Sequence, residues 1–338
     1  MNRCLQLALP GAGNVAPNPL VGAVLVHEDR IIGEGYHKKY GEAHAEVNCI
    51  SSVTNEDKDL IQKSTLYVSL EPCVHFGKTP PCTDLIIKNK IPKVVIGCLD
   101  VYKEVNGKGI EKLQNAGVEV VTDVLEKECR ELNKRFFTYQ QKQRPYIILK
   151  WAESANGKIG SQKERVFISN EFTNRLVHKW RSEEAAILIG KQTALKDDPA
   201  LSNRLWSGKD PVRCVNDSDL SLPSTLKIFD HSIPTIVFNS LKDDEERNIK
   251  WFKVNNKDVS MIVTAMYGLH LQSVLVEGGS KLLQSFIDEG LWDEIRVIRN
   301  EKLVIENGIN SPELKGTYLH RQEKCFRDMI SYFLPSPG

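Results

Sequence analysis

Several features that would place this chain of 338 residues in a special class of protein are missing from it. No apolar run approaches the roughly 18 residues that a membrane-spanning helix needs. No cluster of lysine and arginine stands out, and the formal net charge is +1, so no electrostatic pattern suggests a nucleic-acid partner. The first residues lack the apolar core and the small-residue cleavage site of a signal peptide. We therefore expect neither a membrane nor a nucleic acid among its partners.

The cysteines also lack the pattern of a disulfide framework. There are eight of them, spread along the chain, which indicates reduced thiols and a cytoplasmic protein in which two cysteines bind a metal. We find no internal repeat and no low-complexity tract. Hydrophobic residues make up 41% and charged residues 26% of the chain, and this composition is typical of globular proteins. The length suggests about two domains.

Strand-like and helix-like patterns alternate along the first 120 residues. We expect strands at residues 20–27, 31–36, 65–70, 93–97 and 117–121, the first two joined as a hairpin. We expect helices at residues 43–52, 81–89 and 107–116, followed by one longer helix at 123–139. This alternation predicts an α/β layer with a mainly parallel sheet.

A polar stretch at residues 140–145, ended by a proline, separates this part from a second alternating set. The second set has expected strands at 146–151, 185–190, 212–215, 235–238, 273–277 and 294–298, and expected helices at 170–182 and 280–289. We therefore expect one domain over residues 1–143 and another over residues 144–338.

A three-part zinc signature lies in the first domain. It consists of His44, Cys73 and Cys82, with Glu46 two residues after the histidine. One imidazole and two thiolates leave the fourth position of a catalytic zinc open to water, and zinc lowers the pKa of that water to about 7. A His-x-Glu motif followed by Pro-Cys and a second cysteine is typical of zinc deaminases. Glu46 is accordingly the expected catalytic acid and base, which carries protons from the water to the departing nitrogen.

The alternative is a structural zinc with a fourth protein ligand. Cys49 is the nearest spare thiol, but on a helix it lies roughly 140° around the axis from His44 and should point elsewhere. Cys98 ends a different expected strand, and the sequence leaves it open as a ligand.

Three segments carry a family resemblance. Residues 16–24 read Ala-Pro-Asn-Pro-Leu-Val-Gly-Ala-Val, residues 41–46 read Gly-Glu-Ala-His-Ala-Glu, and residues 69–82 read Ser-Leu-Glu-Pro-Cys-Val-His-Phe-Gly-Lys-Thr-Pro-Pro-Cys. Together they resemble the bifunctional riboflavin-biosynthesis deaminase–reductases. The resemblance implies a cytidine-deaminase-like α/β/α domain that hydrolyses the 2-amino group of 2,5-diamino-6-ribosylamino-4(3H)-pyrimidinone 5′-phosphate. It also implies that Asn18 holds the pyrimidine, with His75 and Lys78 in the loop beside it. Without the resemblance, Asn18 is a turn residue between two prolines.

A second site is expected where the strand at 273–277 opens through Gly278 and Gly279 into a helix. Glycines let phosphates approach the backbone, and helix N–H groups favour their charge, although such a turn alone is more often structural. Together with the segment from Arg181 to Arg204, it resembles the reductase domain of the same family. That domain has a dihydrofolate-reductase-like α/β fold and transfers a hydride from NADPH to C1 of the open-chain ribosyl group.

The resemblance assigns residues to both ligands of the reductase. The substrate-binding residues it implies are Arg181, Leu201, Arg204 and Glu277. The NADPH-binding residues it implies are Ala152, Phe167, Thr193, Asp197, Gly279, Ser280, Lys281, Leu282, Leu283, Gln284 and Ser285. Phe167 stands where the family usually has tryptophan, and Arg165 stands where a serine commonly contacts substrate.

Two other functions fit parts of the sequence. One is a deaminase of a free or polymeric nucleobase with a non-catalytic tail, and the other is a zinc-stabilised scaffold protein with dead sites. The near-neutral charge speaks against the first, and the intact Glu46 speaks against the second. The family resemblance also implies a homo-oligomer that acts on a small phosphorylated pyrimidine.

Overall fold

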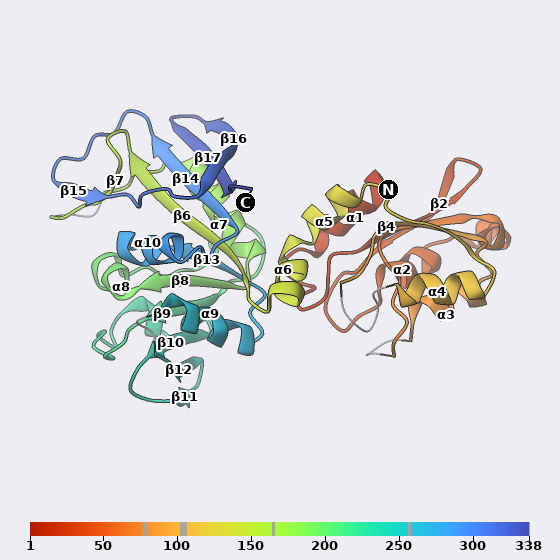
Figure 1. Cartoon of the computed structure of the whole chain (residues 1–338), viewed down its shortest axis with the longest axis horizontal. Helices are drawn as coiled ribbons and strands as arrows, with labels where there is room; N and C mark the ends of the chain where they lie inside the picture. Colours follow the sequence, from red (N-terminus) through yellow and green to blue (C-terminus); the bar gives the residue numbers. More distant parts are fainter. Residues whose placement is uncertain (77–79, 102–106, 164–165, 256–257, 338) are drawn as a thin grey trace. The chain divides into compact units, whose positions relative to one another are not determined.

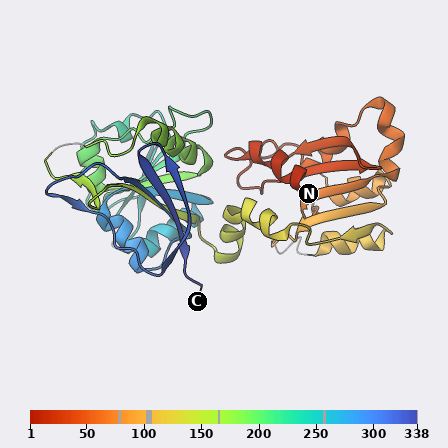
Figure 2. The same ribbon diagram turned by 90° about the horizontal axis from the view of Figure 1, so that it is seen from above.

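The computed structural model describes residues 1–76, 80–101, 107–163, 166–255 and 258–337. The chain forms two compact units, Met1–Lys142 and Gln143–Gly338, and each has its own sheet and its own helices (Figures 1 and 2). In the described part of the chain, no helix is long and apolar enough to cross a membrane.

The first unit is built on a five-stranded sheet in the order β2-β1-β3-β4-β5. Strand β1 is antiparallel to both β2 and β3, whereas β4 and β5 run parallel to β3. The hairpin and the mainly parallel portion are those that the sequence predicts. The strands are β1 (Gly22–His27), β2 (Arg30–Tyr36), β3 (Thr65–Leu70), β4 (Lys93–Cys98) and β5 (Glu119–Val121).

Helices cover both faces of this sheet and give three layers (Figure 1). One apolar cluster joins the sheet to α2, α3 and α4, and another joins it to α1, α5 and α6. This arrangement confirms the predicted α/β/α class. The helices are α1 (Asn2–Ala8), α2 (Ala45–Ser51), α3 (Cys82–Lys88), α4 (Lys108–Asn115), α5 (Glu126–Leu132) and α6 (Lys134–Lys142), with 3-10 turns η1 (Leu9–Gly11) and η2 (Asn55–Lys63).

Helix α2 lies unusually close to β2, because two residues of that strand are glycines. A Cβ atom on Gly33 would lie 2.6 Å from the Cys49 carbonyl oxygen, and one on Gly35 would lie 2.2 Å from the Cys49 nitrogen. These distances are far below a van der Waals contact, so the backbone of α2 can take this position only while both side chains are absent.

The single helix expected at 123–139 was wrong. The structure has two helices, α5 and α6, separated at Asn133, whose backbone leaves the helical region at φ −105° and ψ 18°. The Asn133 amide is 2% exposed and accepts a hydrogen bond from Leu20 N at 2.8 Å while it donates one to Leu20 O at 2.9 Å. The helix breaks at Asn133 because the side chain of this residue pairs with both backbone groups of Leu20, which lies in the segment that precedes β1.

The second unit is built on a ten-stranded sheet in the order β11-β12-β10-β9-β8-β13-β6-β14-β17-β16. The strands from β12 to β14 in that order are parallel, and β11, β17 and β16 are antiparallel to their neighbours. The strands are β6 (Tyr146–Ser154), β8 (Ala186–Gly190), β9 (Val212–Asn216), β10 (Thr235–Asn239), β11 (Asp244–Glu246), β12 (Ile249–Lys253), β13 (Ser273–Glu277), β14 (Glu294–Asn300), β16 (Thr317–Cys325) and β17 (Asp328–Pro335), with a small pair β7 (Lys158–Ser161) and β15 (Gly308–Asn310) beside them.

Helices cover both faces of the second sheet as well (Figure 2). Helices α9 and α10 share one apolar cluster with the sheet, and α7 and α8 lie against the other face. Because neighbouring parallel strands end at the same edge, the residues that follow β6, β8, β9 and β13 gather there. The helices are α7 (Glu171–Glu183), α8 (Lys191–Asp197), α9 (Val259–Gly268) and α10 (Ser280–Asp288), with the 3-10 turn η3 (Lys227–Phe229).

We predict that Asn133→Ala lowers the free energy of unfolding of the first unit by about 2 kcal/mol, because two partly buried backbone groups of Leu20 lose their partner. The matched control is Asn115→Ala, at an exposed position. The tryptophans, Trp151, Trp180, Trp206, Trp251 and Trp292, all lie in the second unit. The urea midpoint seen by circular dichroism should therefore fall, while the midpoint seen by tryptophan fluorescence should stay. Equal shifts in both variants would contradict the role of Asn133.

Candidate functional site

Three predicted metal ligands meet in the first unit. His44 is the N-cap of α2, Cys82 is the first residue of α3, and Cys73 lies in the loop after β3. The Nδ1 atom of His44 is 3.6 Å from Cys73 Sγ and 3.4 Å from Cys82 Sγ. In a tetrahedral zinc site, nitrogen and sulfur ligands are about 3.5 Å apart. The spacing of these donor atoms therefore fits Zn²⁺.

The surroundings of Cys73 favour the thiolate that a metal needs. The neighbouring Cys82 thiol, followed by the His44 imidazole, lowers the pKa of the Cys73 thiol to about 4. The Cys82 backbone N–H also donates to Cys73 Sγ at 3.4 Å. Of the two cysteines, only Cys82 begins a helix, and the Cys73 sulfur accepts the backbone N–H of this first helical residue.

Neither spare cysteine joins the site. Among the described residues, the group that could hold this metal consists of His44, Cys73 and Cys82. Cys49 is fully buried in the apolar cluster between α2 and the sheet, and Cys98 Sγ donates to the Ser69 carbonyl at 3.5 Å. Three donors leave one tetrahedral position for another ligand, as in a catalytic zinc site.

Glu46 lies in the first turn of α2 and is 3% exposed. Burial, followed by the nearby Cys73 thiolate, raises the pKa of its carboxyl. A carboxyl with a raised pKa accepts and returns a proton more readily near neutral pH than an ordinary glutamate does.

A cavity of about 480 Å³ is lined by His44, Cys73 and Glu46. Asn18 lines this cavity, and its Nδ2 atom lies 3.1 Å from Nε2 of His37. His37 is buried, and its Nδ1 atom lies 3.1 Å from the Ala43 carbonyl oxygen. The N–H on Nδ1 donates to that carbonyl, so Nε2 accepts from the Asn18 amide and fixes its orientation. His75 also lines the cavity, whereas Lys78 lies outside the described residues.

Two residues of this cavity were not found from the sequence. One is His37, and the other is Glu71, whose buried carboxylate accepts backbone N–H groups from Asp100 at 3.3 Å, Gly107 at 3.0 Å and Gly109 at 2.9 Å. Glu71 precedes the Pro-Cys motif, and its partners follow β4. It therefore holds Asp100 and the start of α4 beside the Pro-Cys motif.

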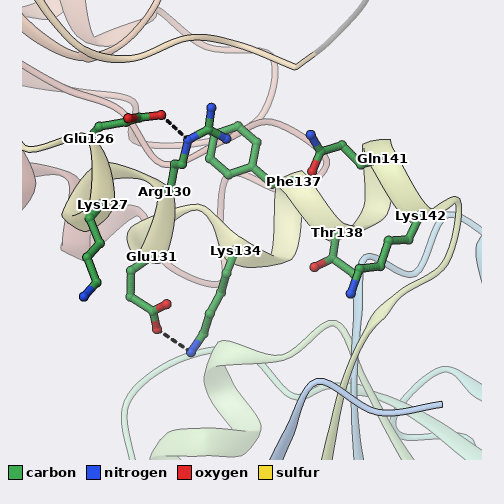
Figure 3. Close-up of a pocket in the computed structure, with 9 residues that line it drawn as sticks. All are labelled: Glu126, Lys127, Arg130, Glu131, Lys134, Phe137, Thr138, Gln141 and Lys142. Carbon is green, nitrogen blue, oxygen red and sulfur yellow. Dashed lines mark hydrogen bonds and ion pairs between the residues drawn. The ribbon is translucent and has the colours of Figure 1, made fainter. Parts of the chain in front are cut away.

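A second hollow in the first unit lies over α5 and α6 (Figure 3). Its charges are mostly paired along the helix surface, as in Glu126 with Arg130 and Glu131 with Lys134. It contains none of the metal donors. The cavity around Glu46 is therefore the candidate active site of this unit.

In the second unit, the structure brings three charged side chains together at the end of β13. Arg181, at the end of α7, donates to Glu277 from Nε at 2.9 Å and from a terminal nitrogen at 2.8 Å. Lys150, opposite Glu277 on β6, has its Nζ 3.6 Å from the same carboxylate. Burial favours protonation, but Arg181 and Lys150 outweigh it and hold the pKa of Glu277 at about 2. No motif in the sequence marks Lys150, and its position opposite Glu277 follows only from the strand register.

Two other predicted substrate residues lie nearby. Burial, followed by the charges of Arg181 and Arg204, lowers the pKa of His178 to about 4, so its neutral ring can accept the Arg204 backbone N–H at 3.2 Å. Leu201 is 2% exposed and has a φ of 50°. Its side chain belongs to an apolar cluster, so only its backbone can reach a ligand.

The predicted cofactor residues lie along one edge of the second sheet. A Cβ on Gly278 would lie 3.1 Å from Thr193, and one on Gly279 would lie 3.3 Å from it, so α8 and the start of α10 are close neighbours (Figure 1). Gly278, Gly279 and Ser280 are partly exposed at the start of α10, where helix N–H groups favour a ligand's phosphates, and the fit to a dinucleotide rests on this feature.

The other predicted cofactor residues differ in how they could contact a ligand. Ala152 is on β6, Asp197 ends α8, and Phe167 is 79% exposed. Leu282 and Leu283 face the core, whereas Lys281 is exposed. Arg165 lies outside the described residues. The ligand-binding roles of all these residues stay predictions.

Known proteins resemble both units. The family described as the cytidine and deoxycytidylate deaminase zinc-binding region matches residues 1–98, and the RibD C-terminal domain family matches residues 145–304. The riboflavin biosynthesis protein RibD of Aquifex aeolicus is 40% identical over 317 residues, which are 90% of this chain and 87% of the relative. The Escherichia coli K12 protein of that name is 32% identical, with 90% and 87% of the two chains covered.

A solved structure agrees over nearly the whole chain. The Thermotoga maritima diaminohydroxyphosphoribosylaminopyrimidine deaminase/5-amino-6-(5-phosphoribosylamino)uracil reductase superposes with a TM-score of 0.91 at 36% identity, covering 99% of this chain and 97% of that one. The Acinetobacter baumannii RibD superposes with a TM-score of 0.90 at 28% identity, covering 99% and 98%.

The donor set predicts one zinc ion per chain. Cys82→Ala should lower zinc affinity by more than about 100-fold, since groups that merely orient a ligand already contribute about 10- to 100-fold. Cys49→Ala is the matched control, because it removes a buried thiol outside the site. Metal analysis after dialysis against a chelator measures the zinc. Retention of a full zinc equivalent by Cys82→Ala would exclude this thiolate as a ligand.

Proposed function

Because the chain belongs to the RibD family, bifunctional riboflavin-biosynthesis enzymes that join a deaminase to a reductase, we propose that residues 1–143 deaminate and residues 144–338 reduce one phosphorylated pyrimidine. The first reaction removes the 2-amino group of 2,5-diamino-6-ribosylamino-4(3H)-pyrimidinone 5′-phosphate. The second converts the ribosyl group of the product into a ribityl chain. The observation that carries this proposal is the convergence of His44, Cys73 and Cys82 on one metal site, next to a cavity that Glu46 also lines.

In the deaminase, Zn²⁺ bound by His44, Cys73 and Cys82 would supply a water of lowered pKa. Glu46 is placed to take a proton from the attacking water as its oxygen bonds to C2, and to pass that proton to the amino nitrogen, so that the C2–N bond would break and ammonia would leave. Asn18 orients the pyrimidine through the end of its amide that His37 does not engage. The largely enclosed position of Glu46 limits exchange of its proton with bulk solvent.

In the reductase, NADPH would supply the hydride that C1 of the open-chain sugar accepts. Arg204, whose side chain is exposed, is suited to bind the substrate phosphate, because a guanidinium group grips phosphate through two parallel hydrogen bonds. Arg181 is already engaged by Glu277 and holds that carboxylate in place for substrate hydroxyl groups.

Lys150 is the best-placed proton donor of the reductase. Burial lowers the pKa of its ammonium group, which makes the proton easier to transfer. Its Nζ lies beside Glu277, at the end of the strand where the substrate is proposed to bind. We assign to it the proton that the substrate takes up as C1 is reduced.

The setting of the enzyme is also part of the proposal. Its free cysteines support a reducing compartment such as the cytoplasm, and the family resemblance supports a homo-oligomer. A coupled assay that follows ammonia and NADPH in one tube, with the diamino riboside phosphate as substrate, tests both activities together. Ammonia release without NADPH oxidation would disprove the assignment of the second domain.

Glu46→Gln should lower the rate of ammonia release by about 100- to 10,000-fold, because the amide cannot carry the proton. Zinc content should stay at the wild-type value, and reduction of the separately supplied deaminated intermediate should be largely unchanged. Full deaminase activity in this variant would show that another group carries the proton.

Arg204→Ala should raise the KM for the riboside phosphate about 10-fold or more, since one charge-assisted phosphate contact is lost, and it should change the KM for NADPH much less. Arg175→Ala, at an exposed position on α7, is the control. Initial rates with each ligand varied in turn measure the effect, and an equal loss for both ligands would contradict a substrate-specific role.

A further inference from the structure

A small charged cluster lies at the carboxyl ends of β8 and β9 in the second sheet. Lys191 directly follows β8, and Asp217 directly follows β9. These strands are parallel neighbours, so their ends lie side by side. Lys191 Nζ makes an ion pair with Asp219 and lies 3.7 Å from Asp217 Oδ1. No part of the deamination or reduction described above uses these residues.

Asp217 has an unusual hydrogen-bonding state. The residue is 1% exposed, and its Oδ2 accepts the Leu222 N–H at 3.0 Å. Its other oxygen, Oδ1, has no hydrogen-bond partner within the part of the chain that the structure describes. A buried carboxylate oxygen without a donor is costly and uncommon. A ligand hydroxyl group would satisfy it.

The sheet order indicates which ligand reaches this cluster, and this step rests on the proposed function. Strands β9, β8, β13 and β6 are consecutive neighbours, and ligands of such sheets bind along the carboxyl ends of the strands. If the pyrophosphate of NADPH lies at the glycine turn after β13, the nicotinamide must extend over β6, toward Lys150 and Glu277. The adenosine half then extends the other way, over β8 and β9.

We propose that Lys191 recognises the 2′-phosphate on the adenosine ribose of NADPH, and that Asp217 Oδ1 accepts a hydroxyl group of the same ribose. The side chain of Asp219 is 64% exposed, so it can turn into solvent when the phosphate replaces it on Lys191. The buried Asp217 stays in place through its bond to Leu222. Lys191 thereby distinguishes NADPH from NADH, whose ribose carries a hydroxyl group at that position.

Calorimetric titration of the full-length enzyme with NADP⁺ and with NAD⁺ tests this proposal by binding alone. Lys191→Ala should weaken NADP⁺ about 10- to 100-fold and leave NAD⁺ nearly unchanged. Asp219→Ser should tighten NADP⁺, because it removes the competing carboxylate. Asp217→Asn should weaken both dinucleotides alike. Lys250→Ala is the matched control, because Lys250 is also a partly exposed lysine in an ion pair, with Glu245, but lies on β12 and outside this cluster.

The outcomes separate this proposal from the function on which it rests. A wild-type enzyme that binds neither dinucleotide would overturn the reductase assignment, and the role of Lys191 with it. A wild-type enzyme that prefers NADP⁺, with the same preference in Lys191→Ala, would overturn the role of Lys191 alone. Equal weakening of both dinucleotides by Lys191→Ala would overturn it too, since a merely structural lysine predicts that result.

Discussion

The geometry of the deaminase site depends on how closely α2 approaches β2. With side chains at Gly33 or Gly35, the helix backbone would be pushed away from the sheet, and His44 and Glu46 would move with it. The thiolates are placed independently, by the end of β3 and the start of α3. A metal site assembled from separate elements tolerates only small shifts, because donor distances must hold within a few tenths of an ångström. The absence of side chains at these two positions of β2 is therefore as important to the metal site as the ligands themselves.

The sequence predicts well what is encoded by short-range spacing. His44, Glu46, Cys73 and Cys82 could be found because the chemistry of each residue type and its position at a strand end or helix start agree. His37 and Glu71 could not be found in this way, since each acts through a backbone or side-chain partner that only the fold brings near. The break at Asn133 has the same origin: local pattern favours a continuous helix, and the distant backbone of Leu20 overrides it.

In the reductase site, the contrast between residues that a motif reveals and residues that only the fold brings into place is stronger. Arg181 and Glu277 belong to recognisable motifs, but Lys150 is the one charged residue in a mainly apolar run at 146–152. Only the pairing of β6 with β13 places it opposite Glu277. Two cations share this carboxylate, so the cluster carries an excess positive charge in a largely dry environment. Such an excess charge is costly, and burial accordingly lowers the pKa of Lys150, which favours loss of its proton.

The helix that follows Glu277 carries Leu282 and Leu283, whose side chains are buried in the core. Any contact that this segment makes with a dinucleotide must therefore come from its main chain or from the neighbouring polar residues. One aliphatic residue can then replace another here if it fills the same volume in the core, and the shape of the binding surface does not change. Persistence of leucine at these positions among relatives would reflect the interior of the domain rather than recognition of the nucleotide.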